Sequence, residues 1–196
     1  FDVVKTLYDE DLTFKTSQWT DPWTNNASNS STLTFWGPMW LGRYSLNMAN
    51  YETNPTAGDW GMVNAPGSFF WGGTWLMASN QCDMKADAGQ VVYDLCISAD
   101  NLKAMAQGGE FVNSVPVMTE VANDPSFAID WLGNQNPAGV LLASASTIDN
   151  STVGPNDGTI NDLFQQAVGS YLSGDIETVA DAEASFKANV KDVGII

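Results

Sequence analysis

The chain of 196 residues contains no histidine. Without histidine, neither a Ser-His-Asp triad nor a Cys-His pair can form, and the commonest protein ligand of metal ions is missing. An enzyme built on this sequence would have to use carboxylates, lysine or tyrosine as its reacting groups. The absence of one residue type therefore excludes the histidine-dependent classes of hydrolase.

Basic residues are also scarce, with 7 lysines and arginines against 23 aspartates and glutamates, for a net charge of −16. A nucleic-acid partner is not expected, because its phosphates require a basic face. Binding to an anionic membrane surface through charge is disfavoured for the same reason. A neutral ligand fits this composition better than an anionic one.

There are only two cysteines, Cys82 and Cys96, and the segment between them has the pattern of one helix over residues 84–95. At a helical rise, the separation of about fourteen residues between the two cysteines spans ~21 Å, whereas a disulfide requires Cα atoms within about 7 Å of each other. We therefore predict two free thiols. The sequence also shows no signal peptide, and it begins at Phe1, so we expect a processed product or an excised fragment.

Tryptophan is abundant, and five of the eight tryptophans lie between residues 32 and 79. Several of them stand beside glycines at the ends of predicted strands. Aromatic rings next to an accessible backbone make a flat apolar wall that suits the face of a sugar ring. The alternative for each of these residues is burial in the core, which is common for tryptophan.

The hydrophobic periodicity predicts a mixture of strands and helices. The predicted strands are residues 32–36, 59–64 and 73–79, and residues 140–146 form a strand or an apolar connector. The predicted helices are residues 38–49, 84–95, 100–107, 159–172 and 179–190, with a helix tail at residues 1–7.

The candidate ligand-binding residues are aromatic, glycine and amide side chains near these strand ends. Phe35 and Trp36 alternate along the first strand, so one is expected to face a cleft and the other the core. Amides both donate to and accept from hydroxyls, although a simple polar loop is the alternative reading of the amide cluster. The set consists of Trp36, Trp40, Trp71, Gly72, Gly73, Trp75, Asn134 and Gln135.

Nearly the whole chain resembles the central and C-terminal part of an extracellular carbohydrate solute-binding protein of an ABC importer, of the family 1 type. The matching segments, in order, are VVKTLYDEDLTFKTSQWTDPW, TFWGPMWL, GDWGMVNAPGSFFWGGTWLMAS, FVNSVPVMTEVAND, WLGNQNP and INDLFQQAVGSYLSGDIETVADAEASFKANV. The chain departs from that family in lacking its opening βα units and its lipid-attachment cysteine.

The resemblance implies an α/β fold of the periplasmic-binding-protein type II class, with two lobes that close on a sugar. Residues 1–70 and 124–196 would belong mainly to the second, C-terminal lobe. Residues 78–123 would be a returning segment of the N-terminal lobe, and Trp71 to Trp75 would form a hinge crossing. The remainder of the N-terminal lobe is then an expected partner.

The function implied by the resemblance is the capture of an oligosaccharide for import, without catalysis, metal or cofactor. The other partners would be the membrane permease subunits, and the location would be the cell surface, with a lipid anchor, or the periplasm. Two alternatives remain open. One is a glycoside hydrolase fragment that uses two of Asp21, Asp59 and Asp130 as acid and base. The other is a structural or adhesive surface protein.

Overall fold

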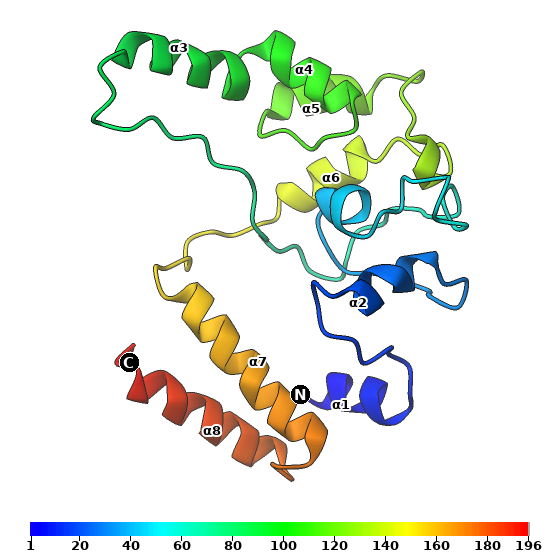
Figure 1. Cartoon of the computed structure of the whole chain (residues 1–196), viewed down its shortest axis with the longest axis vertical. Helices are drawn as coiled ribbons and strands as arrows, with labels where there is room; N and C mark the ends of the chain where they lie inside the picture. The colour runs from blue at the N-terminus through cyan, green and yellow to red at the C-terminus, as the bar shows by residue number, and fades with distance from the viewer. Residues whose placement is uncertain (196) are drawn as a thin grey trace. The chain divides into compact units, whose positions relative to one another are not determined.

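The computed structural model describes residues 1–195, and 48% of the chain is helical. The backbone forms two compact units, which we describe separately (Figure 1). The terminal unit combines Phe1–Thr16 with the segment from Asp149 onward, and the central unit is Ser17–Ile148. None of the described helices is both long enough and apolar enough to cross a membrane.

The terminal unit contains the helices α1 (Asp2–Asp9), α7 (Asp157–Ser173) and α8 (Val179–Asp192). Aromatic rings join them. The ring of Phe1 lies edge-on to Phe164 and Tyr171, at centroid distances of 5.4 and 5.9 Å, and Phe164 meets Phe186 on α8 at 5.6 Å. The helices predicted at residues 159–172 and 179–190 are confirmed as α7 and α8. Their apolar faces pack against each other.

The turn between α7 and α8 is closed by backbone and hydroxyl groups. Gly174 has a φ of 86°, the left-handed conformation that suits glycine at the end of a helix. The carbonyl of Ser170 accepts bonds from the Ser173 hydroxyl at 3.0 Å and from the Ile176 amide at 3.1 Å. Thr178 then caps α8 by accepting the Asp181 amide at 3.1 Å. These bonds reverse the chain and set the two helices side by side.

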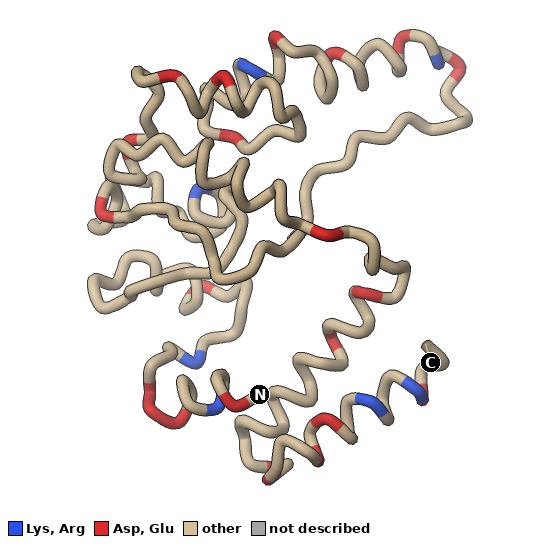
Figure 2. Tube along the Cα trace, turned by 180° about the vertical axis from the view of Figure 1, so that it is seen from behind, with Lys and Arg blue, Asp and Glu red and all other residues tan. Residues whose placement is uncertain are grey.

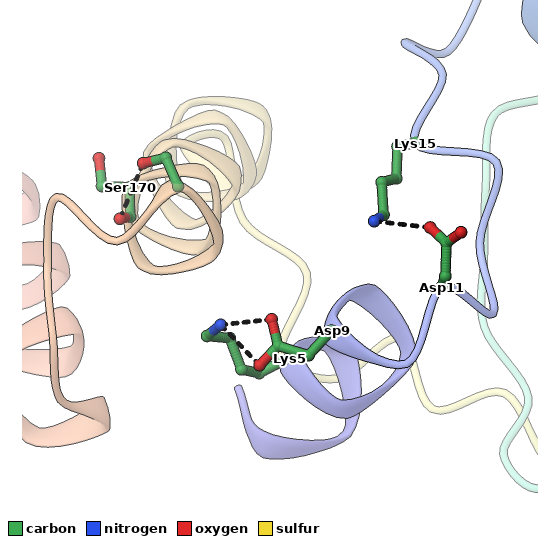
Figure 3. A network of polar contacts seen from close by, with 6 residues as sticks. Lys5, Asp9, Asp11, Lys15 and Ser170 are labelled. Atoms are coloured by element: carbon green, nitrogen blue, oxygen red, sulfur yellow. Dashed lines mark hydrogen bonds and ion pairs between the residues drawn. The ribbon is translucent and has the colours of Figure 1, made fainter.

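Ion pairs on the surface of the terminal unit are local (Figure 3). Lys5 contacts Asp9 at 2.6 Å, and Lys15 contacts Asp11 at 2.7 Å. The bond from Lys15 lowers the pKa of the Asp11 carboxyl below its ordinary value. Because these groups are exposed, each pair contributes little to stability. Acidic residues are spread along both units, and basic ones are few (Figure 2).

The central unit is built from short helices and long connecting segments. Its helices are α2 (Asp21–Asn25), α3 (Lys85–Cys96), α4 (Ala99–Gln107), α5 (Val115–Ala122) and α6 (Ala138–Ala145). Single turns are η1 (Asn26–Ser28), η2 (Leu41–Ser45) and η3 (Asp130–Leu132). The predicted helices at residues 84–95 and 100–107 are confirmed as α3 and α4.

Two apolar clusters hold the central unit together, and Phe127 packs against both. The first consists of Ala27, Met39, Leu41, Leu46, Met48, Ile129, Trp131 and Leu132. The second consists of Leu102, Ala106, Val112, Val117, Met118, Val121 and Ala138, and joins α4, α5 and α6. The first cluster underlies the site described below.

The turn η2 is π-helical, because the Leu46 amide bonds the carbonyl of Leu41, five residues back, at 2.9 Å. Within it, Gly42 packs directly against Trp131, and a Cβ at this position would lie 2.9 Å from the indole ring. A glycine is therefore required for this approach. The helix predicted at residues 38–49 is thus present only as a short helical segment that includes this wide turn.

The strands predicted at residues 32–36, 59–64 and 73–79 are wrong as assignments for this structure. Within residues 1–195 the pairing of extended backbone is limited to one bridge, between Ile129 and Gln135. A strand exists only through hydrogen bonds to a neighbouring strand, and these three segments have none. Residues 140–146, predicted as a strand or connector, lie largely in α6. The predicted α/β class is therefore observed in its helices and not in its sheet.

Helix α3 is poorly covered by the rest of the central unit. It packs beside α4, but none of its residues is buried. Met84, Val91 and Leu95 recur at helical spacing and are all exposed, as is the open segment that leads into the helix (Figure 1). The predicted state of Cys82 and Cys96 is confirmed, because both are free thiols.

Candidate functional site

A cavity of about 510 Å³ lies in the central unit. Its walls come from four segments: residues 34–40, residues 62–73, residues 110–111 and the face of α6 that continues to Ile148. This volume is in the range of sites that hold small ligands. All four segments belong to the central unit.

The wall of the cavity is strongly aromatic. Trp36, Phe69, Phe70, Trp71 and Phe111 all line it. The side chain of Trp36 is 61% exposed, so much of its ring is open to a ligand. Packing of the core does not require these rings to be exposed. Exposed aromatic rings that gather around a cavity are typical of binding surfaces.

Ligand contact and burial in the core were predicted as alternatives for Trp40, but its position combines features of both. It lines the cavity, and it also packs half-buried against the first apolar cluster. Its ring is nearly parallel to that of Trp19, with 10° between the planes, and meets Trp71 edge-on at a centroid distance of 5.6 Å. Trp19 and Trp71 are 5.8 Å apart. The three rings hold one another in place at the base of the wall.

Gly72 and Gly73 follow Trp71 and also line the cavity. Their φ angles are 67° and 135°, which other residues rarely adopt. A Cβ on Gly72 would lie 3.9 Å from the ring of Trp40. The two glycines therefore let the chain bend away from the aromatic wall while leaving its backbone open to the cavity.

Three predicted site residues do not line the cavity. The side chain of Trp75 is 78% exposed and lies beyond the bend, and Asn134 is exposed at a left-handed position with a φ of 63°. Gln135 lies outside the cavity lining and supports it through hydrogen bonds to Met62. It accepts the Met62 amide at 2.6 Å and donates to the Met62 carbonyl at 2.7 Å, which fixes the segment that carries the cavity wall.

Glu110 forms a polar edge of the cavity and was not among the site residues predicted from the sequence. Among the residues that the structure describes, it is the only charged side chain lining the cavity. Its Oε1 accepts a bond from the Tyr44 hydroxyl and lies 3.3 Å from Nη1 of Arg43. The bond to Glu110 raises the pKa of the Tyr44 phenol above its ordinary value. The carboxylate is therefore held in a fixed orientation by two donors.

The face of α6 is the second missed component. Leu141, Ser144, Ala145 and Ile148 line the cavity at helical spacing, a pattern that was available in the sequence. The Ser144 hydroxyl lies 3.0 Å from that of Ser68. The bond joins α6 to the turn that precedes Phe69, so the helix and the aromatic wall are fixed to each other.

The carboxylates proposed for hydrolysis do not meet at this cavity, because Asp21, Asp59 and Asp130 are all absent from its lining. Asp130 instead accepts the amide of Trp131 at 2.7 Å. A glycoside hydrolase needs two carboxyl groups flanking one bond, and the described lining offers one. No group of three or more potential metal-binding acidic or cysteine side chains occurs within residues 1–195.

Comparisons with protein-family models, with curated proteins and with solved structures found no match to this chain. Its function is therefore inferred from its own residues and their geometry.

Proposed function

We propose that the chain is the ligand-capturing part of a carbohydrate-binding protein that serves an ABC importer and does not cleave its ligand. The observation that carries the proposal is the cavity wall formed by Trp36, Trp40 and Trp71 beside Gly72 and Gly73. We propose an extracellular location, with a lipid anchor, or a periplasmic one, and permease subunits as membrane partners.

The physical basis is the match between an aromatic wall and a pyranose ring. The C–H groups on one face of a sugar pack against indole rings, and its hydroxyls at the edge bond to polar groups. Exposed backbone at Gly72 and Gly73 supplies donors and acceptors near the rings. The net charge of −16 favours a neutral ligand over an anionic one.

We also propose that the two-lobe, type II periplasmic-binding-protein fold forms when an N-terminal lobe packs against this chain. Residues 32–36, 59–64 and 73–79 would then gain the strand neighbours that they lack here. The exposed apolar side chains of Val91 and Leu95 on α3, and of Met84 at its N-cap, support this proposal, because exposed apolar patches often mark surfaces that pack against a partner.

The test is calorimetric titration with neutral malto-, cello-, xylo- and galacto-oligosaccharides, combined with mass analysis of the products. We expect at least one series to bind and every glycan to be recovered at its original length. Trp71→Ala should abolish or strongly weaken binding, while Trp75→Ala, a change outside the cavity, should leave it intact.

Steady release of shortened sugar would assign the chain to the hydrolases. Equal binding by the Trp71 and Trp75 variants would move the site away from the aromatic wall. Failure of all four series to bind would contradict the proposal.

A further inference from the structure

We propose that Glu110 makes the cavity selective for uncharged sugars over acidic sugars such as hexuronates. Its carboxylate would accept a hydroxyl of a neutral ligand and repel a ligand carboxylate. The inference rests on the proposed function and specifies the class of ligand that the same site takes.

The first step is the hydrogen bonding of Glu110. Both neighbouring donors, the Tyr44 hydroxyl and Nη1 of Arg43, act on Oε1. Oε2 receives no hydrogen bond from any residue that the structure describes. The Glu110 side chain is 24% exposed. A carboxylate oxygen accepts strongly from hydroxyl donors. The free oxygen is therefore available to a ligand hydroxyl.

The second step is the position of the positive charge. Arg43 does not line the cavity, and the same Nη1 that faces Glu110 also donates to the carbonyl of Gly108. The guanidinium therefore lies behind the carboxylate, as seen from the cavity. It orients the Glu110 carboxylate, but it is not placed to receive an acidic ligand. An anionic sugar would meet the negative charge of Glu110 first.

The third step is the contribution of Tyr44. Its hydroxyl donates to the same oxygen as Arg43, so the carboxylate has two points of attachment on one side. Tyr44 is a positioning residue, since it also does not line the cavity. Loss of its hydroxyl should loosen Glu110 without removing the charge.

Two fluorescent probes that differ only at C6 of the sugar test the inference. They are 4-methylumbelliferyl β-glucoside and 4-methylumbelliferyl β-glucuronide, titrated against the protein with tryptophan quenching as the readout. We expect the glucoside to bind at least ten-fold more tightly. Glu110→Gln should strengthen glucuronide binding and reduce the preference to within about three-fold. Its melting temperature reports whether the variant is folded.

The controls separate charge from packing. Glu120→Gln removes a carboxylate that pairs with Lys103 outside the cavity, and it should keep the wild-type preference. Glu110→Asp keeps the negative charge and should continue to reject the glucuronide, even if it binds the glucoside less tightly. Tyr44→Phe should give an intermediate preference.

Equal affinity of the wild type for the two probes would overturn the inference, as would an unchanged preference in folded Glu110→Gln. In either case, weaker glucoside binding by Trp71→Ala would still support the proposed function. Failure of the wild type to bind either probe or any neutral oligosaccharide would overturn both.

Discussion

The ring of Trp40 is stacked on Trp19, with 10° between their planes and 6.1 Å between centroids, and so one face of Trp40 is already occupied. Trp36, by contrast, is mostly exposed and lines the same cavity. The two tryptophans are four residues apart in the sequence, but Trp40 is packed against other side chains and Trp36 is mostly exposed. Stability and binding are therefore expected to respond differently when each is removed.

Trp40→Ala should lower the free energy of unfolding by about 2–4 kcal/mol, because it removes contacts with Trp19, Trp71 and the first apolar cluster. Trp36→Ala should change it by no more than about 0.5 kcal/mol while weakening glycan binding. Urea denaturation and calorimetry provide the two measurements. A Trp36 variant that is as unstable as the Trp40 variant would show that Trp36 belongs to the packing instead.

Gln135→Ala should destabilise the protein by about 1–3 kcal/mol, because both backbone groups of Met62 lose their partner. Hydrogen exchange at the Met62 amide should become faster, since the segment that forms the cavity wall is no longer fixed. Gln90→Ala is the matched control, because that side chain is exposed and bonds only Asp94 on the same helix. Similar effects of the two changes would contradict the role assigned to Gln135.

Asp124 should titrate below its ordinary pKa of 3.8, because the hydroxyl and the amide of Ser126 both bond its carboxylate. A carboxyl with a lowered folded pKa adds stability above its unfolded pKa, and this stability is lost as the pH falls through the folded value. Ser126→Ala should raise the pKa of Asp124 toward 3.8, as measured by carboxyl NMR.

The stability difference between the wild type and Ser126→Ala should be largest at neutral pH and shrink as the pH falls below the ordinary pKa of 3.8. Ser146→Ala is a suitable control, because that hydroxyl bonds the carbonyl of Ala143 and not a carboxylate. A difference that grew on acidification would have the wrong sign for this mechanism.

Thiol counting under denaturing, non-reducing conditions should find two thiols per chain, from Cys82 and Cys96. The melting temperature should also be the same with and without reductant, since no cross-link restrains the unfolded chain. Cys82→Ser should reduce the count to one. A count of zero in monomeric protein would mean that Cys82 and Cys96 are bonded to each other, which a continuous helix α3 between them does not allow.

The features predicted correctly from the sequence are those set by local periodicity. Helices α3, α4, α7 and α8 have caps, glycine stops or apolar stripes within their own residues. The predicted division between Phe35 and Trp36 is met only in part, because Phe35 packs against the first apolar cluster and Trp36 is exposed, but both line the cavity.

The features predicted incorrectly depend on distant residues. The strands at residues 32–36, 59–64 and 73–79 required neighbours that no local pattern supplies. The importance of Gln135 depends on Met62, which is 73 positions away in the sequence. Glu110 likewise gained its role through Arg43 and Tyr44, and one acidic residue among 23 carried no distinguishing signal.

The π-helical turn η2 separates two parts of the site along the chain. Trp40, on the aromatic wall, comes immediately before the turn, whereas Arg43 and Tyr44, which orient Glu110, lie within it. A wide turn of this kind amounts to one residue inserted into an ordinary helix, and each residue of a helix advances by about 100°. Deleting a single codon in this turn would rotate the carboxylate's two supports away from Glu110 while Trp40 stayed in place. Loss of one amino acid from η2 is therefore expected to alter the polar edge of the cavity and to leave the aromatic wall as it is.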